Sequence, residues 1–270
     1  MTSMSDRQVY PNAPVVLVAL ELRHPTAEPL SRAAQLKVKQ LLGKRLPLPR
    51  QATMTSIQAT LGAVQPEVTT ETAPQYVSRD RTMAVTFRSG AVIVETTRYA
   101  QYERFRDVVA LAVEARQAID PVVGVERLGL RYINEIRVPD VGDTLASWEP
   151  WVDRTLLGPA SVVDRLGFNT AQLQGVVMLD QDAGKAIVLR YGPRGGYAVD
   201  PEGSLKRPTP APGPFFLLDI DSFWVPTDNV PELDPKELLT LGDELHQPVR
   251  TLFENLITER LREEVLRHGG

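Results

Sequence analysis

The sequence predicts a mixed α+β fold, in which a curved and mostly antiparallel sheet packs against long helices. Runs with a two-residue alternation of apolar and polar side chains recur along the chain, separated by short turns. Other stretches have the spacing of amphipathic helices. The order of these elements suggests two similar halves, 13–139 and 140–270, which could also form one continuous domain.

The composition is that of an ordinary soluble globular protein. Hydrophobic residues make up 43% and charged residues 24% of the 270 positions, close to the usual averages. The formal net charge of −4 gives no overall attraction to nucleic acid, and no apolar run is long enough to cross a membrane. Cysteine is absent, which excludes disulfides and thiolate chemistry and predicts a cytoplasmic protein.

The first elements follow from local patterns. Residues 1–12 are polar without a period and predict a loose leader. An apolar run that begins to alternate, 14–25, predicts a strand emerging toward solvent. Helical spacing over 27–47, closed by glycine and proline, predicts a helix. A short strand near 56–61 and a polar loop should follow.

The middle of the chain has the clearest signals. Two β-rich runs around Ser89 and Gly90 predict a hairpin. A helix is expected from about Ala100 to Ile119, because apolar residues recur there on one face. The alternating run from Val125 to Val138 predicts a long strand.

The second half begins with a short helix near 151–157 and two strands that turn at 182–184. The proline-rich stretch 200–214 predicts a loop or linker, and 215–226 a further strand. The last helix should begin at Asp234, an N-cap followed by proline. It should kink or break just before Pro248, which lacks a backbone N–H.

Three stretches together resemble a sporadically distributed family of uncharacterised bacterial proteins of similar length. They are "VALELR" near the N-terminus, the central "LGLRYINEI", and "LHQPVRTLFENLITERLRE" after an aspartate-bearing strand. The "LRYIN" strand and the later "LF..IT" helix mark this likeness. The resemblance implies a shared fold and a bacterial origin, and implies no activity.

The strand 125–138 carries the first candidate site residues, Arg127, Arg131, Tyr132 and Asn134. An arginine in mid-strand can clamp a carboxylate or phosphate with two hydrogen bonds, and Asn134 interrupts the apolar face that carries Tyr132. The alternative is structural, with Arg131 paired to Glu135 and Asn134 satisfying a backbone group. The sequence leaves both readings open.

Asp219 and Asp221 complete the candidate set. They lie two residues apart on one side of the strand 215–226. Two carboxylates this close could share a metal ion or a proton, or could form a charged face that matches the arginines of the other strand. We expect a partly buried polar cluster in a groove, with these aspartates facing Arg127, Arg131, Glu135 and Arg137.

No pattern in the chain names a reaction. The three histidines lack ligand spacing, so we expect neither a metal nor a cofactor. We therefore favour a non-enzymatic binding or regulatory protein with a protein partner or self-association. The resemblance adds the expectation of an accessory role in a defence or toxin-neutralising module. The alternative is an enzyme or sensor for a phosphorylated ligand, such as a nucleotide or RNA end, held by the arginine and aspartate cluster.

Overall fold

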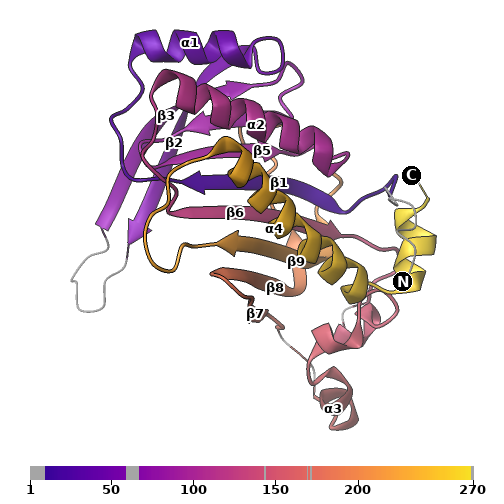
Figure 1. Ribbon diagram of the computed structural model, residues 1–270. Helices are drawn as coiled ribbons and strands as arrows, with labels where there is room; N and C mark the ends of the chain where they lie inside the picture. The colour runs from indigo at the N-terminus through magenta and orange to yellow at the C-terminus, as the bar shows by residue number, and fades with distance from the viewer. Residues whose placement is uncertain (1–9, 59–66, 143, 169, 171, 269–270) are drawn as a thin grey trace.

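The computed structural model describes residues 10–58, 67–142, 144–168, 170 and 172–268 (Figure 1). Within these ranges, nine strands form one antiparallel sheet in the order β2-β3-β4-β5-β1-β6-β9-β8-β7. The strands are β1 (Val15–Arg23), β2 (Leu48–Gln58), β3 (Glu67–Val77), β4 (Met83–Phe87), β5 (Ala91–Thr96), β6 (Arg127–Ile136), β7 (Gly175–Asp180), β8 (Lys185–Gly196) and β9 (Gly213–Trp224). The mixed α+β class and the antiparallel pairing are confirmed, and the sheet dominates the fold.

The helices α2 and α4 cover one face of the sheet, and α1 packs beside α2 (Figure 1). The helical elements are α1 (Arg32–Leu42), α2 (Tyr102–Ile119), α3 (Ala160–Arg165), α4 (Pro235–Leu256), α5 (Glu259–Leu261), short turns at Leu145–Trp148 and Arg154–Leu157, and a π-helical turn at Arg262–Leu266. Both halves of the chain enter the same sheet, because β6 pairs with β9.

The core lies between the sheet and these helices. Alternate residues of the central strands face the helices and are fully buried, among them Leu20, Leu130 and Ile220. They meet Val109 of α2 and Leu245 of α4 in one continuous apolar cluster. The opposite side chains of the same strands therefore point to the face that carries no helix.

A loop crosses this second face. Residues 197–212, which we name the strap, leave the end of β8 and return to β9 after passing over the first half of the sheet. Leu205 of the strap packs on Val77 of β3 and Ala84 of β4, and Lys206 N donates to Arg81 O at 2.7 Å. The proline-rich stretch is thus an ordered cover over part of the sheet.

Several expectations about single elements are confirmed. The hairpin of β4 and β5 turns at Ser89 and Gly90, and α2 ends at Ile119 as expected. Asp234 caps α4, its side chain accepting hydrogen bonds from the N–H groups of Lys236 and Glu237.

The prediction for residues 56–75 was wrong in part. The expected short strand is the much longer β2, which ends at Gln58, while residues 59–61 lie outside the described residues. The expected polar loop contains β3, paired with β2 along its whole length. Thr70 and Thr72 explain the error, because β-branched threonine is polar and yet favours strands.

Two further expectations need correction. Within the predicted leader, residues 1–9 lie outside the described residues, but Tyr10 is buried and donates to Glu254 Oε2 at 2.9 Å. Asn12 N donates to Leu266 O at 3.1 Å, so this end of the leader is anchored. Of the kink or break expected just before Pro248, the break does not occur, because α4 runs on to Leu256. The carbonyl that loses its partner belongs to Glu244, which is an exposed residue.

The short helix expected near 151–157 is a 3₁₀ turn, Arg154–Leu157. The described part of the chain contains no helix long and apolar enough to cross a bilayer.

Candidate functional site

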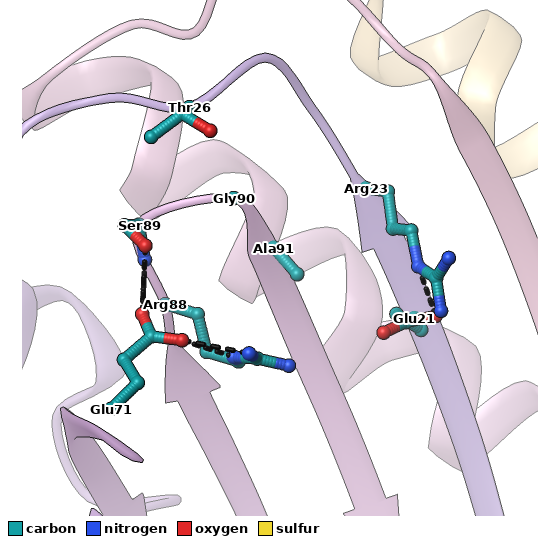
Figure 2. Close-up of a pocket in the computed structure, with 8 residues that line it drawn as sticks. All are labelled: Glu21, Arg23, Thr26, Glu71, Arg88, Ser89, Gly90 and Ala91. Atoms are coloured by element: carbon teal, nitrogen blue, oxygen red, sulfur yellow. Dashed lines mark hydrogen bonds and ion pairs between the residues drawn. The ribbon is translucent and has the colours of Figure 1, made fainter. Parts of the chain in front are cut away.

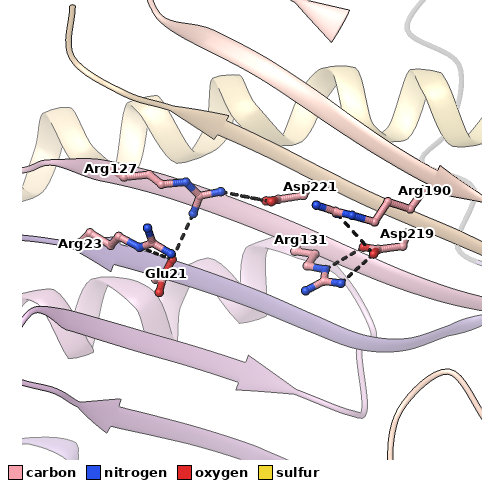
Figure 3. A network of polar contacts seen from close by, with 7 residues as sticks. All are labelled: Glu21, Arg23, Arg127, Arg131, Arg190, Asp219 and Asp221. Carbon is pink, nitrogen blue, oxygen red and sulfur yellow. Dashed lines mark hydrogen bonds and ion pairs between the residues drawn. The ribbon is translucent and has the colours of Figure 1, made fainter. Parts of the chain in front are cut away.

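The sheet face turned away from α2 and α4 carries a network of charged side chains (Figure 3). We call it the charged face, and its members are Glu21, Arg23, Arg127, Arg131, Arg190, Asp219 and Asp221. They come from four adjacent strands, β1, β6, β9 and β8. Because side chains alternate along each strand, odd-numbered positions of β1, β6 and β9 point to this face together.

Arg131 and Asp219 form the most regular pair. Arg131 Nε donates to Asp219 Oδ1 and Arg131 Nη2 to Oδ2, both at 2.7 Å, which is a bidentate arrangement. Arg190 approaches Asp219 Oδ2 from β8 at 3.5 Å. The Asp219 side chain is only 4% exposed while that of Arg131 is 45% exposed. The Asp219 carboxylate is therefore buried and holds the Arg131 side chain, which is itself partly exposed to solvent.

The hydrogen bonds with Asp219 raise the pKa of Arg131 above its ordinary value, although burial acts in the opposite direction. Arg131 lies directly opposite Asp221 in the register, so its bond to Asp219 is diagonal. The structural alternative for Arg131, pairing with Glu135, is not what the structure shows.

Arg127 lies across the sheet and joins three strands. Its Nη1 donates to Glu21 Oε2 at 3.1 Å and its Nη2 to Asp221 Oδ2 at 3.1 Å. The guanidinium also stacks over the Phe223 ring, 4.8 Å from its centroid. Gly129 makes this possible, because a Cβ there would lie 2.2 Å from Arg127 Nη1. Arg127 is thus fixed along the floor of the charged face.

A polar pocket of about 360 Å³ lies at the end of the charged face, between the β4–β5 turn and β1 (Figure 2). Glu71 accepts hydrogen bonds from the Ser89 amide at 2.8 Å and from Arg88 Nε at 2.7 Å. Burial acts to raise the pKa of Glu71, but these hydrogen bonds outweigh it and lower the pKa. Arg23 forms the opposite wall and donates to Glu21 at 2.8 Å.

The strap closes the other end. Glu135 accepts from Arg137 Nε at 2.8 Å and from the Ala198 amide at 2.9 Å. Arg207 of the strap approaches the same carboxylate at 3.5 Å, and the side chains of Glu135 and Arg207 are both buried. This cluster fixes the strap to the sheet. Glu135 and Arg137 do share the face of Arg131, as expected, but they pair with each other and with the strap.

Tyr132 and Asn134 point to the opposite face, among the helices, so the six predicted site residues do not form one site. Tyr132 is buried, which raises its pKa well above the ordinary value. Its hydroxyl lies 3.0 Å from His246 Nδ1 on α4, and the His246 ring stacks on Tyr102 at 4.0 Å. Asn134 donates to Leu218 O at 2.9 Å, which matches its structural reading.

Sequence reasoning missed two members of this region. Arg190 sits in the apolar run "KAIVLRYG", where the available signal was a charged residue inside a continuous apolar run. Glu95 lies in the run "AVIVET" of β5, flanked across the strands by Ala19 and Ala84. Burial raises the pKa of Glu95. No hydrogen bond or ion pair to it occurs within the described residues.

A metal site is not evident at the charged face. Within the described residues, no cluster of three or more His, Asp or Glu side chains could hold a metal ion. Asp219 and Asp221 are engaged by different arginines, so a cation would have to displace a guanidinium from each. Comparison with known proteins adds no assignment, because no protein-family model matches the chain and no curated protein matches it significantly.

Proposed function

We propose that this chain is a non-enzymatic binding protein whose charged face takes up an acidic segment of a protein partner. The observation that carries the proposal is that the positive and negative side chains of the charged face differ in their exposure to solvent. The charged face holds four arginines against three carboxylates. The Asp219 side chain is buried, whereas the side chains of Arg23, Arg131 and Arg190 are 55%, 45% and 37% exposed.

These arginines are held ready for a ligand. Arg131 uses Nε and Nη2 on Asp219, and within the described residues its Nη1 has no hydrogen-bond partner. Arg23 likewise uses only its Nε, on Glu21. Because Asp219 and Glu21 already fix these side chains, a ligand would not have to order them again, which lowers the entropy cost of binding.

The spacing favours an extended ligand. Arg23, Arg131 and Arg190 lie on different strands, β1, β6 and β8. With neighbouring strands about 4.8 Å apart and about 3.4 Å per residue along a strand, the backbones of Arg23 and Arg190 are roughly 20–25 Å apart. A single phosphate could not reach them all, but several carboxylates along a peptide could, each accepting from a guanidinium.

A second candidate function is the sensing of a phosphorylated ligand, and the polar pocket favours it. Its volume of about 360 Å³ is at the lower end of the range for small-molecule sites. Arg23, Arg88 and Ser89 line it with donors. However, Glu21 and Glu71 also line it, and both carboxylates would repel a phosphate.

A binding experiment with two probes separates these functions. Poly-L-glutamate represents an acidic segment, and ATP with and without Mg²⁺ represents a phosphorylated ligand. We expect poly-L-glutamate to bind in a salt-dependent manner and to raise the stability of the chain by about 2.7 kcal/mol at 100 times Kd. The net charge of −4 disfavours binding elsewhere on the molecule.

The variant Arg131→Ala/Arg190→Ala should weaken poly-L-glutamate binding by tenfold or more, because each charge-assisted hydrogen bond contributes about 1.5–3 kcal/mol. Arg45→Ala is the matched control, since Arg45 is similarly exposed but pairs with Asp107 on α2. Equal losses in the two variants, or no binding by the wild type, would contradict the proposal. Saturable binding of ATP alone would favour the second candidate.

A further inference from the structure

The edge strand β7 is unusually apolar for a sheet edge. It closes the sheet beyond β8, and no strand among the described residues pairs with its outer side. Val176 and Met178 are 60% and 61% exposed, and Val177 and Leu179 are also exposed. More than half of the exposed large apolar residues in the described chain fall between Val162 and Leu179. α3 lies just beyond the start of β7 at the same edge (Figure 1).

Natural proteins normally protect such edges with charge, proline or a covering element. The other edge of this sheet follows the rule, because β2 carries Pro49 and Arg50. β7 has no charged residue between Gly175 and Asp180. A strand with free backbone groups and exposed apolar side chains on both faces is a template for a further strand.

An apolar groove of about 410 Å³ lies beside this edge, on the helix side of the sheet. Leu179 and Ile187 form its floor, and Pro248 and Leu252 of α4 form its wall. A strand added next to β7 would place alternate side chains on the helix side, adjacent to Leu179. These side chains would then enter the groove.

We infer that the occupant is a second copy of this chain, joined through antiparallel pairing of the two β7 strands about a two-fold axis. Such a contact is self-complementary and closes at two copies. The two-fold axis must be perpendicular to the sheet, so side chains that point to one face of the sheet in one copy point to the same face in the other. The residue on the axis, Val177 or Met178, then lies opposite its own copy. Asp180 then faces Val176 or Gln174 of the other copy, and no two like charges meet.

A specific interface buries about 800 Å² on each partner. The exposed apolar side chains of β7 supply part of that area. In the dimer the two charged faces lie on the same side of one continuous sheet, and the two α4 helices lie on the other.

Mass measurement by light scattering tests the inference. We expect the wild type at tens of micromolar to have twice the chain mass of 29.9 kDa. Val176→Lys/Met178→Lys should convert it to a monomer with an unchanged circular dichroism spectrum, because both residues are exposed on β7. Leu36→Lys/Leu41→Lys, at exposed positions of α1, should remain dimeric. A monomeric wild type, an open-ended polymer, or a dimeric Val176→Lys/Met178→Lys variant would overturn the inference.

Disulfide cross-linking gives a second measurement that does not depend on disrupting the interface. The chain has no cysteine, so an introduced one reacts in a clean background. The residue on the axis faces its own copy at about 4.5–5.5 Å between Cα atoms, within the range of a disulfide. Val177→Cys or Met178→Cys should therefore form a covalent dimer under oxidising conditions, while Leu36→Cys should not. Absence of cross-linking in both β7 variants would overturn the inference.

Discussion

The two members of the Arg131–Asp219 pair differ in their access to water. Asp219→Ala leaves Arg131 and Arg190 without their shared carboxylate, but Arg131 can turn toward solvent. Arg131→Ala leaves a buried carboxylate with Arg190 alone. We expect both variants to be destabilised, with a coupling free energy of about 1–3 kcal/mol in the double-mutant cycle. Urea denaturation of the four proteins measures it, and additive effects near zero would show that the pair is only a solvated contact.

Glu95 should make stability depend on pH in the direction opposite to most carboxylates. Burial raises its pKa above the ordinary 4.5, so the folded chain binds this proton more tightly than the unfolded chain. Its favourable contribution is present below the unfolded pKa and is lost as pH rises through the folded pKa. Glu95→Gln should thus raise the Tm relative to wild type at pH 7–8, and the gain should vanish toward pH 4. Glu28→Gln, at an exposed position, is the control and should show no such trend.

At the scale of elements, the turn between β7 and β8 offers a direct test of backbone geometry. Gly184 has φ +77°, and a Cβ there would lie 2.2 Å from Val225 O. Gly184→Ala should destabilise the chain by about 1–3 kcal/mol, because a strained left-handed residue costs that much. The neighbouring Ala183 already has φ +58°, so Ala183→Gly should be neutral or stabilising. Thermal melts compare the two variants, and equal changes in Tm would contradict the strained backbone conformation at Gly184.

Elements with a strong local signal could be predicted from the sequence. Asp234 caps α4 because its side chain and the following proline act within one turn. The facing of Arg131 and Asp219 followed from strand alternation together with the expectation that their two strands share one sheet, as β6 and β9 do. The role of Arg190 could not be predicted, because it depends on β8 lying beside β9. Strand alternation also places Tyr132 and Arg131 on opposite faces of the sheet. The prediction that they belong to one site did not take this into account.

For the whole molecule, the strap is expected to control access to the sheet. Glu135→Gln keeps the shape of the side chain but leaves the buried Arg207 without a carboxylate partner. Breaking a buried ion pair in this way costs about 3–5 kcal/mol. We expect a lower Tm and faster tryptic cleavage after Lys206, which the strap's contacts with Arg81 and Thr97 now hold in place. Arg23→Ala, which removes an exposed ion pair, should cost at most about 1 kcal/mol.

Unchanged protection of Lys206 in Glu135→Gln would show that Leu205 packing alone holds the strap. In that case the ion pairs of Glu135 would not be needed to hold the strap on the sheet. The two results can be told apart, because Tm reports the buried charge and cleavage reports the strap.

The position of β1 has a consequence for how the chain reaches this structure. β1 precedes the other described strands in sequence but lies in the centre of the sheet, hydrogen-bonded to β5 and β6. Its partners are far away along the chain, and such non-local pairing slows folding to the millisecond-to-second range. At ordinary rates of translation, on the order of ten seconds pass between the synthesis of β1 and that of β6. The apolar run of β1 therefore stays without its full set of partners for seconds after it has been synthesised.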